Sequence, residues 1–366
     1  MAEMSKEIRA LFLTKYSREG ASTRYRFLQY FPYLESKGIK CTFSPFTDSS
    51  YLRNIYATKR GSAADYVRAL SRRIKALFTV RKYDVVIIEY EILPYFPPIF
   101  ERMLNWLKIP YIVNYDDAIF YRYSNSSNPI VRVLLGGKIS SVMRNAEIVI
   151  AGNQHLADYA FTARAKRIEK LPTAVDIKRY PVSFRKDLTV FTIGWIGSPS
   201  TAKYLKEISP ALAHVCRGGR GKVILTGSGP VELIGVPVEV RPWSEETEVS
   251  DLESCDVGIM PLADGLWEKG KCGLKIIQYM ASSLPVVASP IGVNMEIVED
   301  EVTGMLASSN EDWIRALTML RDDKALRERL GLSGRKSAER RYSVEVTAPK
   351  LASLIIDASR VGTGKA

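Results

Sequence analysis

The feature that most constrains the fold of this chain is a recurring order of strand, glycine-containing loop and helix. Short strand-like runs occur in both halves of the sequence, and helix-like segments separate them. The runs are residues 8–14, 41–45, 85–89, 111–115 and 148–151 in the first half, and 190–194, 222–226, 238–240, 257–260 and 285–288 in the second. This alternation predicts parallel sheets with crossover helices. We therefore expect an α/β protein of two doubly wound, Rossmann-like domains that face each other across a cleft, with ligands at the carboxyl ends of the strands.

Turn signals give the expected boundaries. A helix is predicted over residues 23–37, with Gly38 just past its end, and Thr201 is predicted to cap a helix in the second half. Residues 171–176 predict a short strand and turn, and residues 177–188 a linker. The 366 residues are enough for two domains. We expect these at 1–180 and 186–342, followed by a last helix and tail at 343–366.

Composition excludes several classes of function. The chain has two histidines, His155 and His214, and neither lies in a metal or triad motif. Its four cysteines are scattered, which argues against structural zinc and favours a reducing compartment. The chain contains no apolar run of the roughly 18 residues that a membrane span needs, and its charged N-terminus does not resemble a signal peptide. These features predict a cytoplasmic protein without a metal or cofactor.

Charge is unevenly distributed. Residues 1–186 contain 31 Lys and Arg residues against 16 Asp and Glu residues, whereas the remainder is slightly acidic. The excess is densest over residues 53–82, where an apolar helical spacing at 66, 70, 74 and 77 lies beside Arg68, Arg72, Arg73 and Lys75. Such a helix suits the inner face of an anionic membrane, a plain solvated surface or a nucleic-acid backbone. No nucleic-acid motif accompanies it, so no nucleic-acid partner is expected.

A glycine- and lysine-rich loop opens a helix near residue 274 and predicts a diphosphate site. Gly270 and Gly273 let an anion approach the backbone at the helix N-terminus, and three lysines add charge. These are Lys269, Lys271 and Lys275. The alternative is an ordinary helix start with solvated lysines. Cys272, inside the loop, is interpreted as a small filler residue rather than a nucleophile.

At this point the chain resembles the family 4 (group 1) glycosyltransferases. The pieces that match the nucleotide-sugar signature of that family are Gly273-Leu274, residues 278–281 (Gln-Tyr-Met-Ala), residues 285–288 (Pro-Val-Val-Ala) and residues 292–296 (Gly-Val-Asn-Met-Glu). The two glutamates of the family signature fall on Gly270 and Gln278. The resemblance implies that Gln278 bonds the donor ribose in place of the second glutamate. Glu268 is the candidate to replace the first.

The resemblance implies the GT-B fold, a nucleoside-diphosphate sugar donor and retention of anomeric configuration without an obligatory metal. It also implies that the last helix, about 345–358, crosses back onto the first domain. The expected activity is hexosyl-type transfer to a lipid-linked or cell-surface glycan intermediate in polysaccharide biosynthesis. Two alternatives stay open: a sugar epimerase of GT-B shape, and a nucleotide-sugar-binding protein that has lost activity.

The first turn of the second half offers further donor-binding candidates. Gly197 lets the backbone approach a phosphate and Ser198 offers a hydroxyl; the alternative is a tight turn with an N-cap. Family members commonly carry an arginine and a lysine here. Trp195 takes the arginine's place and Lys203 is the nearest lysine, so Lys271 and Lys275 are expected to supply the charge. Trp243, after a strand, either stacks on the donor base or packs in the core.

Polar residues in the first half define an acceptor side. Asp116 and Asp117 end a strand, and one of them is a candidate general base or ligand of acceptor hydroxyls; the alternative is a loop anchor. Gly20 and Arg24 resemble the family's glycine loop and are candidates for a phosphate contact. Asn153 either touches a sugar or caps the next helix.

Overall fold

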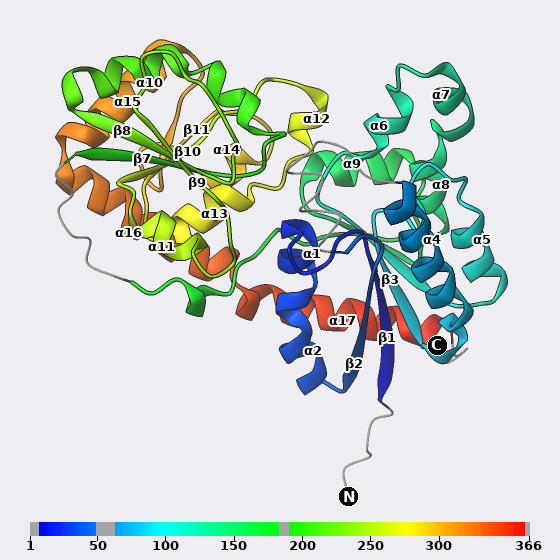
Figure 1. Ribbon diagram of the computed structural model, residues 1–366. Coiled ribbons are helices and arrows are strands. Elements are labelled where there is room, and N and C mark those ends of the chain that lie inside the picture. The colour runs from blue at the N-terminus through cyan, green and yellow to red at the C-terminus, as the bar shows by residue number, and fades with distance from the viewer. Residues whose placement is uncertain (1–6, 49–62, 183–189, 363–366) are drawn as a thin grey trace, which may run out of the picture. The chain divides into compact units, whose positions relative to one another are not determined.

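The computed structural model describes residues 7–48, 63–182 and 190–362, which form two compact units (Figure 1). The first unit comprises residues 1–173, 270–272 and 347–366. The second comprises residues 174–269 and 273–346. Part of the predicted linker, 183–188, and part of the basic stretch, 53–62, lie outside the described residues.

The first unit is built on a parallel sheet of six described strands in the order β2-β1-β3-β4-β5-β6. The strands are β1 (Ile8–Thr14), β2 (Ile39–Pro45), β3 (Val85–Glu89), β4 (Tyr111–Tyr115), β5 (Ile148–Ala151) and β6 (Ile168–Lys170). Every residue of β3, β4 and β5 is buried. Such continuous burial is typical of parallel strands covered by helices on both faces.

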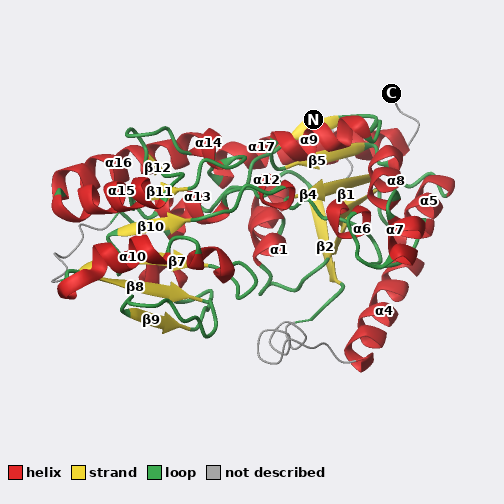
Figure 2. Cartoon of the chain, turned by 90° about the horizontal axis from the view of Figure 1, so that it is seen from above, coloured by secondary structure: helices red, strands yellow, loops and turns green. Residues whose placement is uncertain are grey.

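Helices flank this sheet on both faces (Figures 1 and 2). They are α1 (Ala21–Arg26), α2 (Phe31–Ser36), α4 (Ala63–Phe78), α5 (Ile99–Trp106), α6 (Phe120–Ser124), α7 (Pro129–Leu135), α8 (Lys138–Asn145), α9 (Gln154–Thr162) and α17 (Val344–Gly362). Most of α17 belongs to the first unit. Within that unit the Thr347 and Tyr30 hydroxyls lie 3.0 Å apart, and Asp357 pairs with Arg167 at 3.0 Å.

The second unit is built on a parallel sheet in the order β12-β11-β10-β7-β8-β9. Its described strands are β7 (Phe191–Ile196), β8 (Gly221–Thr226), β9 (Val238–Arg241), β10 (Val257–Met260), β11 (Val286–Ala288) and β12 (Met305–Leu306). Its helices are α10 (Ser209–Cys216), α11 (Glu248–Glu253), α12 (Leu266–Lys269), α13 (Leu274–Ala281), α14 (Asn294–Ile297), α15 (Asn310–Asp322) and α16 (Lys324–Arg341). Trp195 and Trp313 are the largest side chains of its buried core.

The predicted fold class is confirmed: two doubly wound α/β units with parallel sheets. The strand order reverses between β1 and β3 in the first sheet and between β7 and β10 in the second. Ligands of such sheets bind outside the carboxyl ends of the strands at these reversal points. Each unit therefore has one edge at which a site is expected. Within the described residues, no helix is long and apolar enough to cross a membrane.

Two local predictions were wrong, and a third was right in part. The helix expected over 23–37 is divided into α1, a 3₁₀ turn at Leu28–Tyr30 and α2, because the backbone leaves the helical region at Phe27 and Pro32 cannot continue the hydrogen-bond ladder. The strand expected over 171–176 lies earlier, as β6. Thr201 is at the N-cap position, as predicted, but the helix that follows is a short 3₁₀ helix (Ala202–Lys206) and the Thr201 side chain makes no cap bond.

Candidate functional site

Glu89 ends β3 where the first sheet reverses its strand order, and it is buried there. Its Oε2 accepts hydrogen bonds from the Lys15 backbone N–H and from the Thr23 hydroxyl, both at 2.7 Å. Glu89 thus fastens the loop after β1 to the end of β3. Its Oε1 is buried and has no hydrogen-bond partner among the described residues. Burial and the neighbouring Asp116 raise the pKa of Glu89 to about 7.

Tyr90, the next residue, has a left-handed backbone with φ +67°, which is uncommon for an aromatic residue. The Tyr115 hydroxyl donates to its carbonyl at 2.8 Å and holds this conformation. The Tyr90 hydroxyl in turn donates to Asp116 Oδ1 and lies 3.4 Å from the Ser22 hydroxyl. Asp116 is therefore engaged by Tyr90.

Asp117 bonds a different partner from Asp116. Its Oδ1 pairs with Lys271 Nζ at 2.7 Å, and the two side chains are 27% and 19% exposed. Burial by itself lowers the pKa of Lys271, but the attraction of Asp117 and its hydrogen bond together raise that pKa above the ordinary value. Lys271 therefore stays cationic, and a largely buried ion pair lies at the carboxyl end of β4.

Close backbone contacts attach residues 270–272 to the same edge of the first sheet. A Cβ at Gly270 would lie 2.4 Å from Ala118 Cβ, and one at Gly152 would lie 2.4 Å from Cys272 Sγ. The Asn153 side chain also donates to the Lys271 carbonyl at 2.8 Å. Cys272 is buried at 7% exposure, and burial raises the pKa of its thiol.

Asn153 caps α9, because its Oδ1 accepts a hydrogen bond from the Leu156 N–H at 2.9 Å. This is the helix-cap alternative of the two that were predicted for Asn153. Gly20 forms the N-cap of α1, where a Cβ would collide with Tyr16. Arg24 is buried, donates to the Arg18 carbonyl at 3.3 Å and stacks on Tyr25. The first unit thus brings Asp116, Asp117, Asn153, Gly270, Lys271 and Cys272 to one edge.

In the second unit, Lys275 lies at the first turn after β7. Its Nζ is 4.1 Å from the centroid of the Trp195 ring and 3.3 Å from the Thr201 hydroxyl. A Cβ at Gly197 would lie 2.7 Å from the same Nζ, so glycine is required to admit the lysine. The cation comes from α13, whose first turn follows Gly273 in the left-handed conformation with φ +68°.

The other predicted residues around this turn have defined partners. Ser198 Oγ lies 2.9 Å from Ser200 Oγ. Lys203 is exposed and lies over the Tyr204 ring, and Lys269 pairs with Asp264 at 2.9 Å. Glu268 is nearly buried and accepts from the Tyr204 hydroxyl.

Two donor-binding predictions concern residues with polar partners inside the unit. Gln278 is buried in α13, and its amide donates to the Tyr180 hydroxyl at 3.3 Å. Trp243 is half-buried, and its indole N–H donates to Glu248 at 3.1 Å. Leu274 begins α13 and is also half-buried.

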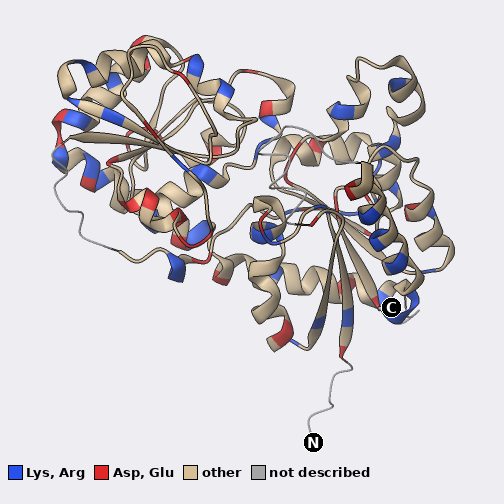
Figure 3. Ribbon diagram, viewed as in Figure 1, with Lys and Arg blue, Asp and Glu red and all other residues tan. Residues whose placement is uncertain are grey.

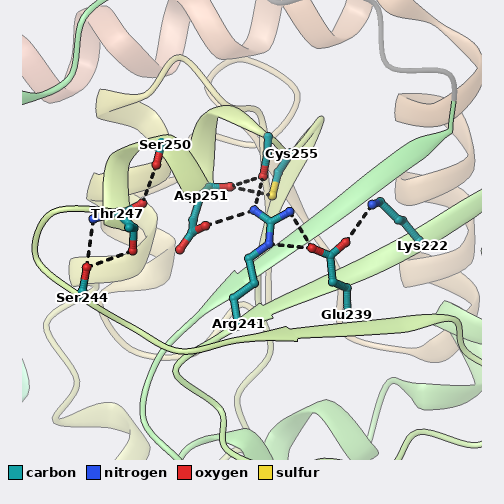
Figure 4. Close-up of polar contacts among 9 residues, drawn as sticks. Lys222, Glu239, Arg241, Ser244, Thr247, Ser250, Asp251 and Cys255 are labelled. Carbon is teal, nitrogen blue, oxygen red and sulfur yellow. Dashed lines mark hydrogen bonds and ion pairs between the residues drawn. The ribbon is translucent and has the colours of Figure 1, made fainter.

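A polar network holds the strand that leads to Trp243 (Figure 4). Arg241, the last residue of β9, bonds Glu239 at 2.7 Å, Asp251 at 3.0 Å and the Ser254 hydroxyl at 2.8 Å. Lys222 of β8 pairs with Glu239 at 2.9 Å. The network ties β8, β9 and α11 together, so it fixes the position from which the loop carrying Trp243 departs.

Comparison with known proteins gives a family match for most of the second unit. Residues 189–323 match the family model described as "Glycosyl transferases group 1". The second unit is therefore similar to group 1 glycosyltransferase domains. A curated relative, the sulfoquinovosyl transferase SQD2 of Arabidopsis thaliana, is 27% identical over 163 residues, which is 41% of this chain and 30% of that protein.

Solved structures share the fold of this chain over nearly its full length. The sucrose-phosphate synthase of Thermosynechococcus elongatus superposes with a TM-score of 0.70 at 14% identity and covers 96% of this chain and 98% of its own. HepE of Anabaena, solved with UDP, superposes with a TM-score of 0.72 at 17% identity and covers 96% of this chain and all of its own. The resemblance predicted from the signature over residues 273–296 is thus confirmed.

Sequence reasoning about the second unit missed Gly227. Its φ is +78°, and a Cβ there would lie 2.5 Å from the Gly197 carbonyl oxygen and 3.0 Å from Trp243 Cβ. Gly227 therefore brings two predicted residues, Gly197 and Trp243, to one edge of the sheet. In the first unit Glu89 was missed as a site residue. A glutamate directly after an apolar strand could have indicated it, because such a residue lies at the carboxyl end of the strand.

Proposed function

We propose that the protein transfers a sugar from a nucleoside-diphosphate sugar to a lipid-linked or cell-surface glycan intermediate, with retention of configuration. The observation that carries the donor side is the position of Lys275 beside Gly197. It places a cation at the carboxyl end of β7, next to the N-terminus of α13. A helix N-terminus and an adjacent lysine suit a diphosphate.

The proposed role of these groups is to stabilise the departing diphosphate. Negative charge grows on the leaving-group oxygens as the bond to the sugar breaks, and fixed cations and N–H groups lower the energy of that state. Lys275 and the backbone around Gly273 act there, with Gln278 on the ribose and Trp243 near the base. The leaving oxygen then takes the proton of the acceptor hydroxyl, so no protein nucleophile is needed.

The first unit is proposed to bind the acceptor. Asp117 is proposed as a hydroxyl ligand or base, because its carboxylate lies at the carboxyl end of β4 and stays 27% exposed despite its ion pair with Lys271. Asp116 is fixed by Tyr90. Lys271 remains a candidate for a phosphate contact, in which case the phosphate competes with Asp117 for the ammonium.

The experiment that tests the activity is turnover of a panel of UDP- and GDP-sugars with and without a lipid-linked acceptor. Acceptor-dependent transfer, with the anomer assigned by NMR, supports the proposal. Epimer release without acceptor identifies an epimerase instead. Binding without turnover identifies an inactive relative. Ligands are first selected by thermal shift, since saturation at 100 times Kd stabilises a protein by roughly 2.7 kcal/mol.

The basic first unit is proposed to contact the inner face of an anionic membrane. Figure 3 shows Lys and Arg along α4. The contacts that these side chains make correct the prediction that all of them are surface cations. Arg73 is buried at 1% exposure and donates to the Thr14 carbonyl at 2.5 Å, so it is not a surface cation. Arg72 pairs with Asp48 at 3.0 Å and Arg68 with Asp65 at 3.3 Å. Charge on α4 alone is therefore a weak anchor.

A further inference from the structure

Helix α7 exposes an apolar face. Of its seven residues, Pro-Ile-Val-Arg-Val-Leu-Leu, only Leu135 is buried. Ile130 is 66% exposed, Val133 81% and Leu134 71%. Positions 130, 133 and 134 have the i, i+3, i+4 spacing of one helical face. Three large apolar side chains together on a surface helix mark an interaction site rather than scattered exposure.

The helix is held in place by its own polar contacts. Asn128 caps it by accepting from the Ile130 N–H at 3.0 Å, and Pro129 occupies the first turn. Arg132 reaches back to the Ser126 carbonyl at 2.6 Å. These contacts satisfy the helix N-terminus, so the apolar face is presented by an ordered element.

The charge around α7 selects the kind of surface it fits. Between Asp117 and Glu147 the sequence has four basic residues and no acidic one. These are Arg122, Arg132, Lys138 and Arg144. Lys138 is buried in an ion pair with Glu91 and adds no surface charge. Arg132 and Arg144 are exposed and Arg122 is half-buried, so the surface charge comes from these three arginines. An apolar face in a basic surrounding is complementary to the headgroup region of an anionic bilayer.

The length of α7 decides how it meets a bilayer. Seven residues make a helix of about 10 Å, whereas a span needs about 20 residues. The helix therefore lies in the interface. Figure 1 shows α6 and α7 beyond the carboxyl ends of the first unit's strands. Only the short α6 separates α7 from Asp117.

We propose that α7 inserts the face formed by Ile130, Val133 and Leu134 into the interface of an anionic bilayer. This inference rests on the proposed function, because a lipid-linked acceptor requires the protein at a membrane. In this proposal α7 supplies the apolar contribution to membrane binding. The basic residues supply only an electrostatic contribution, which weakens as salt rises.

The test compares vesicle binding of two triple variants of the full chain. The α7 variant is Ile130→Gln, Val133→Gln and Leu134→Gln. The control variant is Ile234→Gln, Met319→Gln and Leu332→Gln, three exposed apolar positions of the second unit. Vesicles contain phosphatidylcholine with or without phosphatidylglycerol. We expect partitioning onto the anionic vesicles to fall about tenfold or more in the α7 variant and to stay unchanged in the control.

A labelled variant reports insertion directly. Val133→Cys on a Cys41→Ser background carries an environment-sensitive dye, since Cys216, Cys255 and Cys272 are buried. We expect a blue shift with anionic vesicles and none for the same dye at Ile234→Cys. Equal binding of the two triple variants, or a dimer that the α7 variant dissociates without any vesicle binding, overturns the inference.

Donor turnover separates this inference from the proposed function. An α7 variant that turns over nucleotide sugar but no longer binds vesicles supports the inference. A wild-type protein that turns over donor but never binds vesicles overturns the inference alone. If the wild-type protein binds vesicles through α7 but turns over no donor, the membrane role of α7 is supported and the proposed transferase activity is overturned.

Discussion

The two sheet edges at which ligands are expected are built by different means. At the first edge, charged side chains contact other polar groups: Glu89 is buried, and Asp116, Asp117 and Lys271 are half-buried. At the second, glycines admit close contact, and Lys275 lies against the Trp195 ring and the Thr201 hydroxyl. The first edge is suited to handling a proton or a hydroxyl, and the second to holding an anion. Substitutions at the two edges should therefore affect different properties.

The largest expected difference is between the two lysines. Lys271→Met should lower the free energy of unfolding by about 3 kcal/mol, because it leaves the Asp117 charge largely buried without its partner. Lys275→Met should cost at most about 1 kcal/mol, the scale of a cation–π contact, but should weaken nucleoside-diphosphate binding. Urea unfolding and calorimetric titration with UDP measure both.

The double variant Asp117→Asn with Lys271→Met is the control, and it should regain part of the lost stability. Equal small losses for both lysines would remove the distinction between the two edges.

A pH profile sharpens the account of the first edge. Because the pKa of Glu89 is raised to about 7, the folded protein holds a proton that the unfolded chain releases. This residue makes stability fall as pH rises from about 4.3 to 7. Glu89→Gln should flatten that slope and be more stable than the wild type at pH 8, by up to about 3 kcal/mol.

The matched control is Glu311→Gln, an exposed carboxylate of α15 that should leave the slope as it is. An identical slope in Glu89→Gln and wild type would show that this carboxyl does not hold the proton.

Gly197→Ala tests close approach at the second edge. The added methyl group would lie 2.7 Å from Lys275 Nζ and from the Trp195 ring, so the lysine must move. We expect UDP binding to weaken about tenfold, or about 1.4 kcal/mol. Gly137→Ala, where nothing lies within 4 Å of the new Cβ, is the control. Unchanged UDP affinity in both variants would show that Lys275 does not contribute to donor binding.

The smallest effect is expected at Gln278. Gln278→Ala should weaken donor binding by about 1 kcal/mol, the scale of one hydrogen bond, and Gln278→Glu should restore it. Because the Gln278 amide also bonds the Tyr180 hydroxyl, Tyr180→Phe is measured beside it. The same loss in Tyr180→Phe would assign Gln278 to packing.

Sequence reasoning worked best where the signal is local. The bounds of β1, β3, β4, β5 and β10 were predicted to the residue. Asn153 was predicted as a cap with one alternative, and Gly38 has the positive φ expected past a helix end. A helix was wrongly extended across Phe27, where the backbone leaves the helical region before a 3₁₀ turn at Leu28–Tyr30. The side-chain partners of the predicted site residues were not predicted.

The sequence by itself determined the alternation of strands and helices, the two-unit α/β fold and the glycosyltransferase signature. Each depends on residue spacing along the chain, which periodicity and turn chemistry fix locally. Only the tertiary structure decided that Lys271 meets Asp117, 154 residues away, that Thr23 donates to Glu89, and that Arg73 points inward rather than to solvent. Such pairings depend on which strand ends lie side by side in the sheet. Burial then sets their charge, because a desolvated group keeps or gives up its proton according to its neighbours.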